Sequence, residues 1–382
     1  MAKIRKRTWT NSKGEQTAWI ADYTDQDGKR HIKTFKTKKA ATAWLVTAQG
    51  EVAQGVHTPE SSSITVADAG EIWIAQAKTD GLEASTIRQY RQHLSYHIKP
   101  LIGSLKLAEL SLAGVQDFRN RLIRDGRSRV MAKKVVSSLG AILATAMASG
   151  KVARNVVREQ TRQHGARQRR IEKRHKKQIE VGVDIPTKDE IRAMLAHAQG
   201  RWRPLIVTTV FTGLRASELR GLRWDDVDLD RAVLTVRQRA DRWNMIGSPK
   251  SDAGKRDVPL APMVVNTLRE WKLAYPKGEA NLVFPNGKGN VATLPSIHHR
   301  GLGPLQLAAG ITSDAARPKY GMHSLRHAAA SLFIEQGFTP KRVQALMGHS
   351  TIQMTFDTYG HLFPSEKDDQ AAMRQLQARL VG

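Results

Sequence analysis

Residues 322–359 read MHSLRHAAASLFIEQGFTPKRVQALMGHSTIQMTFDTY and contain His323, Arg326, His349 and Tyr359 beside helix-boundary signals. About a hundred residues upstream, the stretch TGLRASEL contains a further arginine, Arg215. Arginine suits phosphate because its planar, permanently charged fork donates bidentate hydrogen bonds. Tyrosine has an ordinary pKa near 10, so it needs a cationic pocket to react as phenolate. These residue types together indicate a site that clamps a phosphodiester and attacks it with a phenolic oxygen.

The ordered set of Arg215, His323-x-x-Arg326, His349 and Tyr359 resembles the signature of the tyrosine recombinases, the phage-integrase family. The interval from His349 to Tyr359, within GHSTIQMTFDTYGH, is similar to the pattern of that family. The chain looks most like a temperate-phage or mobile-element integrase with an N-terminal arm-binding domain. The resemblance implies a multidomain, mainly α-helical fold with small β-sheets.

The resemblance also implies roles for these residues. Tyr359 would attack the scissile phosphate and form a 3′-phosphotyrosine, which a 5′-hydroxyl of a partner strand then attacks. Arg215, Arg326 and His349 would stabilise the developing charge, and His323 would contact phosphate and carry a proton. Because bond energy is kept in the covalent intermediate, no ATP, metal or other cofactor is expected.

A lysine on a hairpin supplies the leaving 5′ oxygen with its proton in this family, and Lys250 holds the matching place six residues before Arg256. Lys255 remains the rival. The chain has Gly254 where the family usually has serine, which bears on the shape of the hairpin.

Two neighbours of the signature take other roles. Glu218 is expected to orient Arg215. His327 is interpreted as structural because it should point to another helical face.

Composition narrows the class of partner. The formal net charge of +26 over 382 residues indicates a polyanionic partner, most simply nucleic acid. No run reaches the 18 or so apolar residues of a membrane span, and the N-terminus lacks the apolar core of a secretion signal. The absence of cysteine excludes disulfides and thiolate metal sites, and it is compatible with a cytoplasmic location.

Residues 1–57 predict a β-rich module of three strands and a helix. Trp19, Ala21 and Tyr23 alternate as a strand, and Asp27-Gly28 is a hairpin turn signal. Thr37 is a candidate cap for the following helix. Lysine and arginine outnumber acidic residues here, so the module is either a solvated basic sheet or, as preferred, a DNA-reading sheet that resembles arm-site-binding domains.

Residues 64–160 predict a helical, SAM-like domain that resembles the core-binding domain of the family. Apolar stripes such as Ile87, Tyr90, Leu94 and Ile98 are typical of core positions. The basic residues between these stripes are the DNA-facing candidates: Arg88, Arg91, Arg119, Arg121, Lys133 and Lys134. The strongly basic segment that follows, within which residues 161–184 form the predicted linker, is interpreted as a strap across the DNA backbone.

Residues 185–382 predict the catalytic domain, which a capping box at Thr187–Glu190 opens. A mainly helical domain with one small sheet is expected, with Ser248-Pro-Lys250 at a hairpin tip. The tail from Asp368 to Leu380 carries one apolar stripe and is too short to be stable alone. In this family such a tail docks on a neighbouring protomer; the alternative is a helix folded back on its own domain.

The predicted partners are double-stranded DNA at core and arm attachment sites and three further copies of the chain in a DNA-bound homotetramer. From the resemblance, a host DNA-bending protein and an excision factor are further possible partners, and no membrane partner is expected. The protein is expected at the nucleoid of the host cell. Two alternatives stay open: a same-fold transposon recombinase or chromosome-dimer resolvase, and a DNA-binding regulator without catalysis. The N-terminal sheet argues against the resolvase, and the intact site argues against the regulator.

Overall fold

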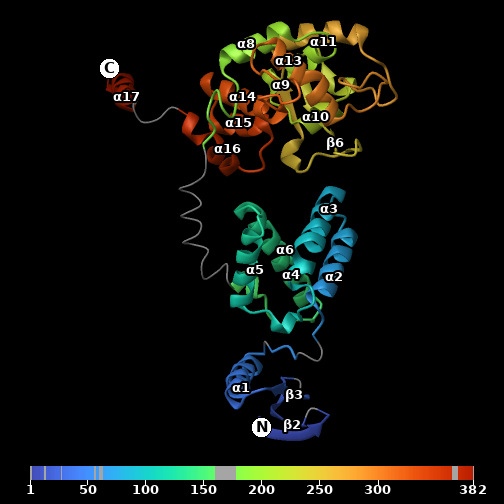
Figure 1. Cartoon of the computed structure of the whole chain (residues 1–382). Helices are drawn as coiled ribbons and strands as arrows, with labels where there is room; N and C mark the ends of the chain where they lie inside the picture. Colours follow the sequence, from blue (N-terminus) through green and yellow to red (C-terminus); the bar gives the residue numbers. More distant parts are fainter. Residues whose placement is uncertain are drawn as a thin grey trace. The chain divides into compact units, whose positions relative to one another are not determined.

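A computed structural model describes residues 2–12, 14–26, 28–55, 57–59, 63–159, 178–363 and 369–381. The chain divides into two compact units, Met1–Lys176 and Lys177–Gly382 (Figure 1). Of the predicted basic linker, residues 161–184, the part up to residue 177 lies outside the described residues. The two units are therefore described separately.

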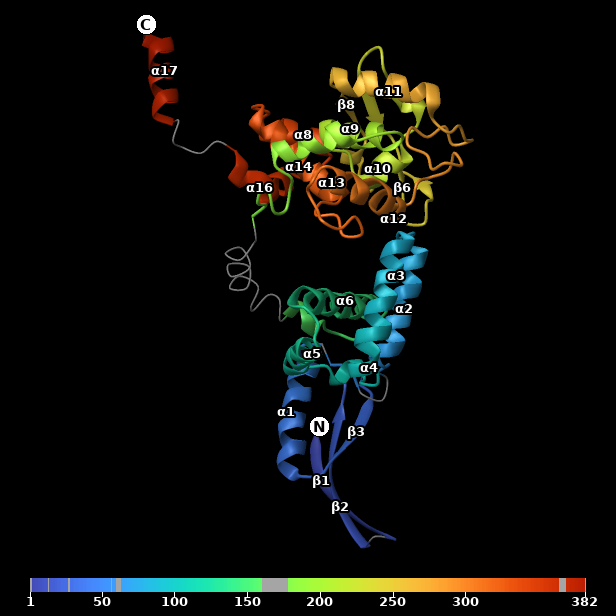
Figure 2. The ribbon, with the colours of Figure 1, turned by 45° about the horizontal axis from the view of Figure 1, so that its top comes forward.

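The first unit begins with an antiparallel sheet of order β1-β2-β3 and a helix that covers one of its faces. The elements are β1 (Lys3–Asn11), β2 (Gly14–Thr24), β3 (Arg30–Phe35) and α1 (Lys38–Ala53). Thr37 caps α1 as expected, accepting a hydrogen bond from the Ala40 backbone N–H. Ala21, Tyr23 and Leu45 form the small core between sheet and helix, and Figure 2 shows α1 running along the sheet.

The rest of this unit is a bundle of helices around one apolar core. Its elements are α2 (Val66–Thr79), α3 (Ala84–His93), a π-helical segment (Leu94–Ile98), α4 (Lys99–Ile102), α5 (Leu112–Arg124) and α6 (Arg129–Ala148). Leu94 and Ile98 are fully buried, while Ile87 and Tyr90 pack against that core. Of the basic DNA-facing candidates, all but the half-buried Arg119 are exposed.

Helix α6 is long and apolar enough to cross a membrane by length and composition alone. Half of that window is buried inside the bundle, where Val135, Leu139 and Ile142 are fully enclosed. A helix in the core of a globular domain can be equally long and apolar. The apolar composition of α6 is therefore explained by its packing in the bundle.

The second unit is mainly helical and encloses a larger apolar core. Its main helices are α8 (Lys188–His197), α9 (Trp202–Thr212), α10 (Ala216–Gly221), α11 (Pro262–Ala274), α12 (Leu294–Ser296), α13 (Gly303–Ala308), α14 (Met322–Glu335), α15 (Pro340–Met347) and α16 (Ile352–Tyr359). Buried α9 packs against both α11 and α14. The capping box at Thr187 and Glu190 is formed as predicted.

Two small sheets accompany these helices, where one was expected. The first has the order β4-β5-β8, made of β4 (Val227–Asp228), β5 (Val233–Val236) and β8 (Arg256–Pro259). Between β5 and β8 the chain adds a second hairpin, β6 (Arg239–Ala240) with β7 (Ile246–Gly247). Ser248-Pro-Lys250 therefore follows a separate hairpin instead of forming the tip of the main one.

Helix α17 (Asp369–Val381) forms the tail. Its apolar side chains Met373, Leu376, Leu380 and Val381 are all at least half exposed. The apolar stripe predicted from sequence is thus present and uncovered within the described chain.

Candidate active site

Two glycines in left-handed conformation bring the chain segments of the site together. Gly213 ends α9 with φ 62°, and Gly348 ends α15 with φ 61°. A side chain at either position would also collide with its surroundings: a Cβ at Gly348 would lie 2.7 Å from a terminal nitrogen of Arg256. Glycine is therefore required both for backbone geometry and for close approach.

Arg215 stands at the start of α10, as the sequence indicated, and bridges two segments. One terminal nitrogen donates to Glu218 Oε1 at 2.6 Å, and the other donates to the carbonyl oxygen of Gly348 at 2.7 Å. Its side chain remains 35% exposed. Arg215 is thus held in place while about a third of its side chain stays exposed to solvent.

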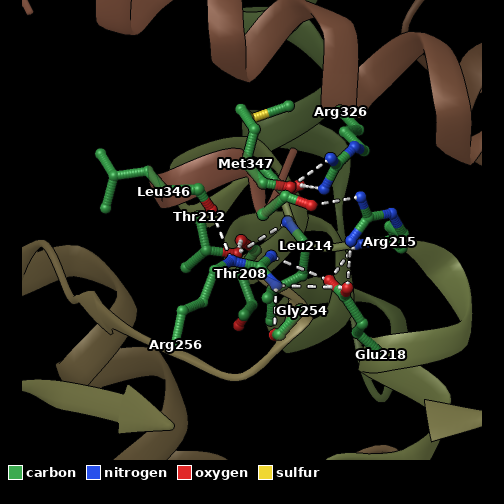
Figure 3. A network of polar contacts seen from close by, with 12 residues as sticks. Thr208, Thr212, Leu214, Arg215, Glu218, Gly254, Arg256, Arg326, Leu346 and Met347 are labelled. Carbon is green, nitrogen blue, oxygen red and sulfur yellow. Dashed lines mark hydrogen bonds and ion pairs between the residues drawn. The ribbon is translucent and has the colours of Figure 1, made fainter. Parts of the chain in front are cut away.

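Glu218 is shared between two arginines (Figure 3). Besides Arg215, it accepts a hydrogen bond of 2.9 Å from Arg256, and both partners of that pair are buried. Burial opposes ionisation of Glu218, but the hydrogen bond and charge of Arg256 and the charge of Arg215 hold its pKa below the ordinary value. The expected role of Glu218 in orienting Arg215 fits this geometry.

Arg256 is a site residue that sequence reasoning used only as a reference point for Lys250. Its guanidinium donates to the carbonyl oxygens of Leu346 and Gly254 at 2.7 and 2.9 Å, in addition to Glu218. It therefore ties β8 and α10 to the end of α15. The segment RDVPL around it was visible in the sequence, but nothing local signals a partner 90 residues away.

Arg326 lies in the first turns of α14 and is 3% exposed. It donates at 2.6 Å to the Gly213 carbonyl oxygen and also to that of Met347. Burial and the neighbouring charge of Arg215 lower its pKa to about 10, so it stays protonated at neutral pH. These two hydrogen bonds go to uncharged carbonyls, which orient the guanidinium without cancelling its positive charge.

His349 is buried directly after Gly348, with its Nδ1 3.0 Å from the hydroxyl of Thr355. Its ring is nearly parallel to that of Tyr359, with centroids 6.2 Å apart. Burial first, and then the charge of Arg326, lower the pKa of His349 to about 4. Thr355 is a further residue that sequence reasoning missed, although its spacing of four residues before Tyr359 on one helix offered a signal.

The expectation that His327 points to another helical face is wrong. Its Nδ1 lies 2.6 Å from the hydroxyl oxygen of Tyr359, and its ring packs edge-on against His323 at 4.2 Å. The positions 323 and 327 are four residues apart on α14, so they share a helical face. That spacing could have identified the pair from the sequence.

Tyr359 is the last residue of α16 and is 1% exposed. Burial raises its pKa to about 12, while the charges of Arg326 and Arg215 act in the opposite direction. The phenol is therefore neutral and within electrostatic range of both arginines of its own chain. His323 has its pKa lowered by desolvation and then by Arg326.

Lys250 and Lys255 are both exposed, on either side of the 3₁₀ turn Asp252–Gly254. Because both side chains are open to solvent, each lysine remains a candidate for the general acid. Sterics explain why position 254 is a glycine, because a Cβ there would lie 2.6 Å from Pro249 Cβ. The departure from the family's serine thus follows from packing against this chain's own Pro249.

The cluster carries an excess of positive charge. Three guanidinium groups, from Arg215, Arg256 and Arg326, surround one carboxylate, that of Glu218. Within the described ranges, no group of three or more His, Cys, Asp or Glu side chains could hold a metal ion. A site with uncompensated arginines beside a buried tyrosine hydroxyl is suited to an anionic phosphodiester.

These features bring a buried tyrosine and three arginines together on a mainly helical domain. Residues 186–366 match the Phage integrase family, and residues 65–123 match the Phage integrase N-terminal SAM-like domain. The chain therefore carries a phage-integrase, or tyrosine recombinase, family domain together with the SAM-like N-terminal domain of that family.

Among curated relatives, the putative prophage phiRv2 integrase of Mycobacterium tuberculosis is 28% identical over 343 residues, covering 87% of this chain and 86% of the relative. Among solved structures, the Tn1549 transposon integrase in complex with a circular intermediate DNA aligns with a TM-score of 0.65 at 22% identity, over 82% of this chain and all of that one. A lambda integrase tetramer bound to a Holliday junction aligns with a TM-score of 0.55 at 18% identity, over 90% and 95% of the two chains. The fold class expected from the sequence is confirmed.

Proposed function

We propose that this protein is a site-specific DNA recombinase that cuts and rejoins DNA through a 3′-phosphotyrosine at Tyr359, and that it integrates and excises a phage or mobile element. One observation carries the proposal. The positive charges of Arg215 and Arg326 act on the buried hydroxyl of Tyr359 in the same chain. These two arginines share a single carboxylate neighbour, Glu218, so the site has a net positive charge.

The proposed chemistry proceeds in two transesterifications. Tyr359 Oη attacks the scissile phosphorus and passes its proton to His323, the proposed proton carrier. A phosphotyrosine bond forms, and the bond to the 5′ oxygen breaks. Lys250 protonates that leaving oxygen, with Lys255 as the rival. A 5′-hydroxyl from the partner strand then attacks the phosphotyrosine and releases Tyr359. One phosphodiester is exchanged for another, so the balance requires neither ATP nor a metal ion.

The remaining site residues stabilise the charge that develops on phosphorus. Arg215 and Arg326 neutralise the nonbridging oxygens from prearranged positions. His349 has its Nδ1 engaged by Thr355, which leaves Nε2 to donate to a phosphate oxygen once that atom carries the proton. His323, one turn before Arg326, is proposed to contact the phosphate and carry a proton.

The proposed domain organisation assigns residues 1–57 to arm-site DNA, 64–160 to the core site, 161–184 to a basic linker and 185–382 to catalysis. Supporting this, Lys3, Arg5 and Arg7 alternate along β1, so they share the sheet face opposite Ala21 and α1. Lysine and arginine on such a face gain affinity by releasing counterions from the phosphate backbone.

The proposed assembly is a homotetramer on double-stranded DNA, with a host DNA-bending protein and an excision factor as accessory partners, at the nucleoid in the cytoplasm. The lambda integrase relative is a tetramer on a Holliday junction. The second candidate function is that of a transposon recombinase. It is supported by the similarity to the Tn1549 transposon integrase, whose structure contains a circular intermediate DNA.

A recombination assay tests the proposal. Two plasmid-borne sites taken from the DNA flanking the gene are incubated with the protein in EDTA without ATP. The proposal predicts recombinant junctions with the wild type and none with Tyr359→Phe. Junctions that require a divalent metal or ATP would refute the mechanism. DNA binding without any junction in any site pair would favour a regulator.

A further inference from the structure

The contact between His327 and Tyr359 has no role in the chemistry described so far. His327 Nδ1 lies 2.6 Å from Tyr359 Oη, and the two rings meet edge-on with centroids 5.5 Å apart. The phenol is buried among apolar side chains that include Ala330, Ile334 and Met347. A buried hydroxyl needs a hydrogen-bond partner, and His327 is the one that the structure shows for Tyr359 within the described chain.

The charge state of His327 allows Tyr359 to donate this hydrogen bond. Desolvation, then the nearby His323 and Arg326, lower its pKa to about 4, against a smaller opposite effect of Asp184. The imidazole is therefore neutral near pH 7, with one nitrogen donating and the other accepting. Tyr359 also keeps its proton. In the tautomer of His327 that carries its proton on Nε2, the hydroxyl donates and Nδ1 accepts.

This bond restricts where the phenolic oxygen can lie. Tyr359 sits at the end of α16, and its hydroxyl would otherwise be able to turn among apolar neighbours. His327 belongs to α14, the same helix that presents Arg326, so one rigid element sets the position of both groups. A shared helix keeps the distance between nucleophile and phosphate clamp constant.

We propose that His327 is a positioning residue for the nucleophile: its Nδ1 accepts the hydrogen bond of Tyr359 and holds the phenolic oxygen beside Arg215 and Arg326 of the same chain before DNA is cut. The inference rests on the proposed function, because it presumes that Tyr359 attacks the phosphate. His327 acts through Tyr359 and does not itself touch the phosphate.

The test is single-turnover cleavage of a nicked suicide DNA substrate at saturating protein. His327→Leu removes the acceptor at similar size, and its cleavage rate constant should fall by about 10²-fold, the effect of a small misplacement of a reacting group. Affinity for a half-site should be unchanged, because His327 is proposed to act only through Tyr359. His327→Asn places an amide oxygen where Nδ1 stood, and it should recover most of the lost rate.

His327→Gln is the matched control, since its amide reaches the Nε2 position instead and should stay slow. Thermal unfolding of all three variants separates this effect from loss of folding, and the Asn–Gln comparison stands even where the Leu variant does not fold. Wild-type cleavage by His327→Leu would overturn the inference, as would equal rates for equally stable Asn and Gln variants.

The same substrate distinguishes this inference from the proposed function. If Tyr359→Phe still forms a covalent adduct, the proposed function fails. If Tyr359→Phe is inactive while His327→Leu cuts at the wild-type rate, only the positioning role fails.

Discussion

At the scale of residues, the two arginines that we propose to clamp the phosphate are held in different ways. Arg215 pairs with Glu218, which Arg256 shares, whereas Arg326 is bound through the backbone carbonyls of Gly213 and Met347. Carbonyls orient a guanidinium without cancelling its charge. Arg326 therefore provides the larger uncompensated charge, and Arg215 provides the more accessible one.

Arg215→Ala and Arg326→Ala should each cut a suicide substrate at least about a thousandfold more slowly, as loss of a transition-state arginine in phosphoryl transfer does. Arg192→Ala, which removes an exposed arginine paired with Asp189, is the control and should cut normally. Rates are compared in proteins with unchanged circular dichroism. A folded Arg215→Ala protein within about tenfold of wild type would exclude a transition-state role for Arg215.

The general acid can be assigned with a substrate whose 5′ leaving oxygen is replaced by sulfur, because sulfur leaves without a proton. Lys250→Ala should cut ordinary DNA slowly and the sulfur-containing DNA at a rate close to wild type. Lys255→Ala should show the same modest change on both substrates. Rescue of Lys255→Ala and not of Lys250→Ala would transfer the role to Lys255.

Stability should depend on pH through His349. Its pKa is about 4 in the folded protein and near 6.5 when unfolded, so between these values the unfolded chain binds more protons. The free energy of unfolding therefore falls as pH falls, by about 2 kcal/mol from this group between pH 7 and pH 5. His349→Gln should flatten the curve measured by denaturant titration. Equal slopes for both proteins would show that His349 is not buried in its neutral form.

At the scale of elements, local signals in the sequence predicted much of the secondary structure. The Thr37 cap, the Thr187 capping box and the placement of His323 and Arg326 in one turn of α14 depend on residues three or four apart. The extra hairpin β6–β7 was missed because its strands are two residues each, too short for an alternating pattern to be read.

Deletion of helix α17 should impair the pairing of protomers on DNA. Its uncovered apolar stripe fits a tail that docks on a neighbouring protomer, and deletion after Glu366 removes it. The truncated protein should bind a single half-site normally, lose cooperative binding to paired half-sites and lose strand exchange, because docking in trans couples the protomers. Gel-shift titrations on one and two half-sites, beside a recombination assay, measure this. Undiminished cooperativity and recombination would leave a tail that packs only on its own domain.

At the scale of the whole molecule, the ordered motif set led from sequence to family because the fold brings distant segments to one place. What the sequence could not show is how they are held. Arg256 reaches Leu346 across 90 residues, and Arg326 reaches Gly213 across 113. Such contacts depend on tertiary packing and leave no periodic trace, so the supporting network and the His327–Tyr359 bond required a structure.

The most direct test of the central claim is to trap and map the covalent intermediate. The protein is incubated with a nicked suicide substrate in EDTA, digested with trypsin and analysed by mass spectrometry. Formation of a 3′-phosphotyrosine predicts that the DNA-linked peptide carries the modification on Tyr359, and that Tyr359→Phe binds the same DNA but yields no adduct. An adduct on another residue, or one that persists in Tyr359→Phe, would contradict the account.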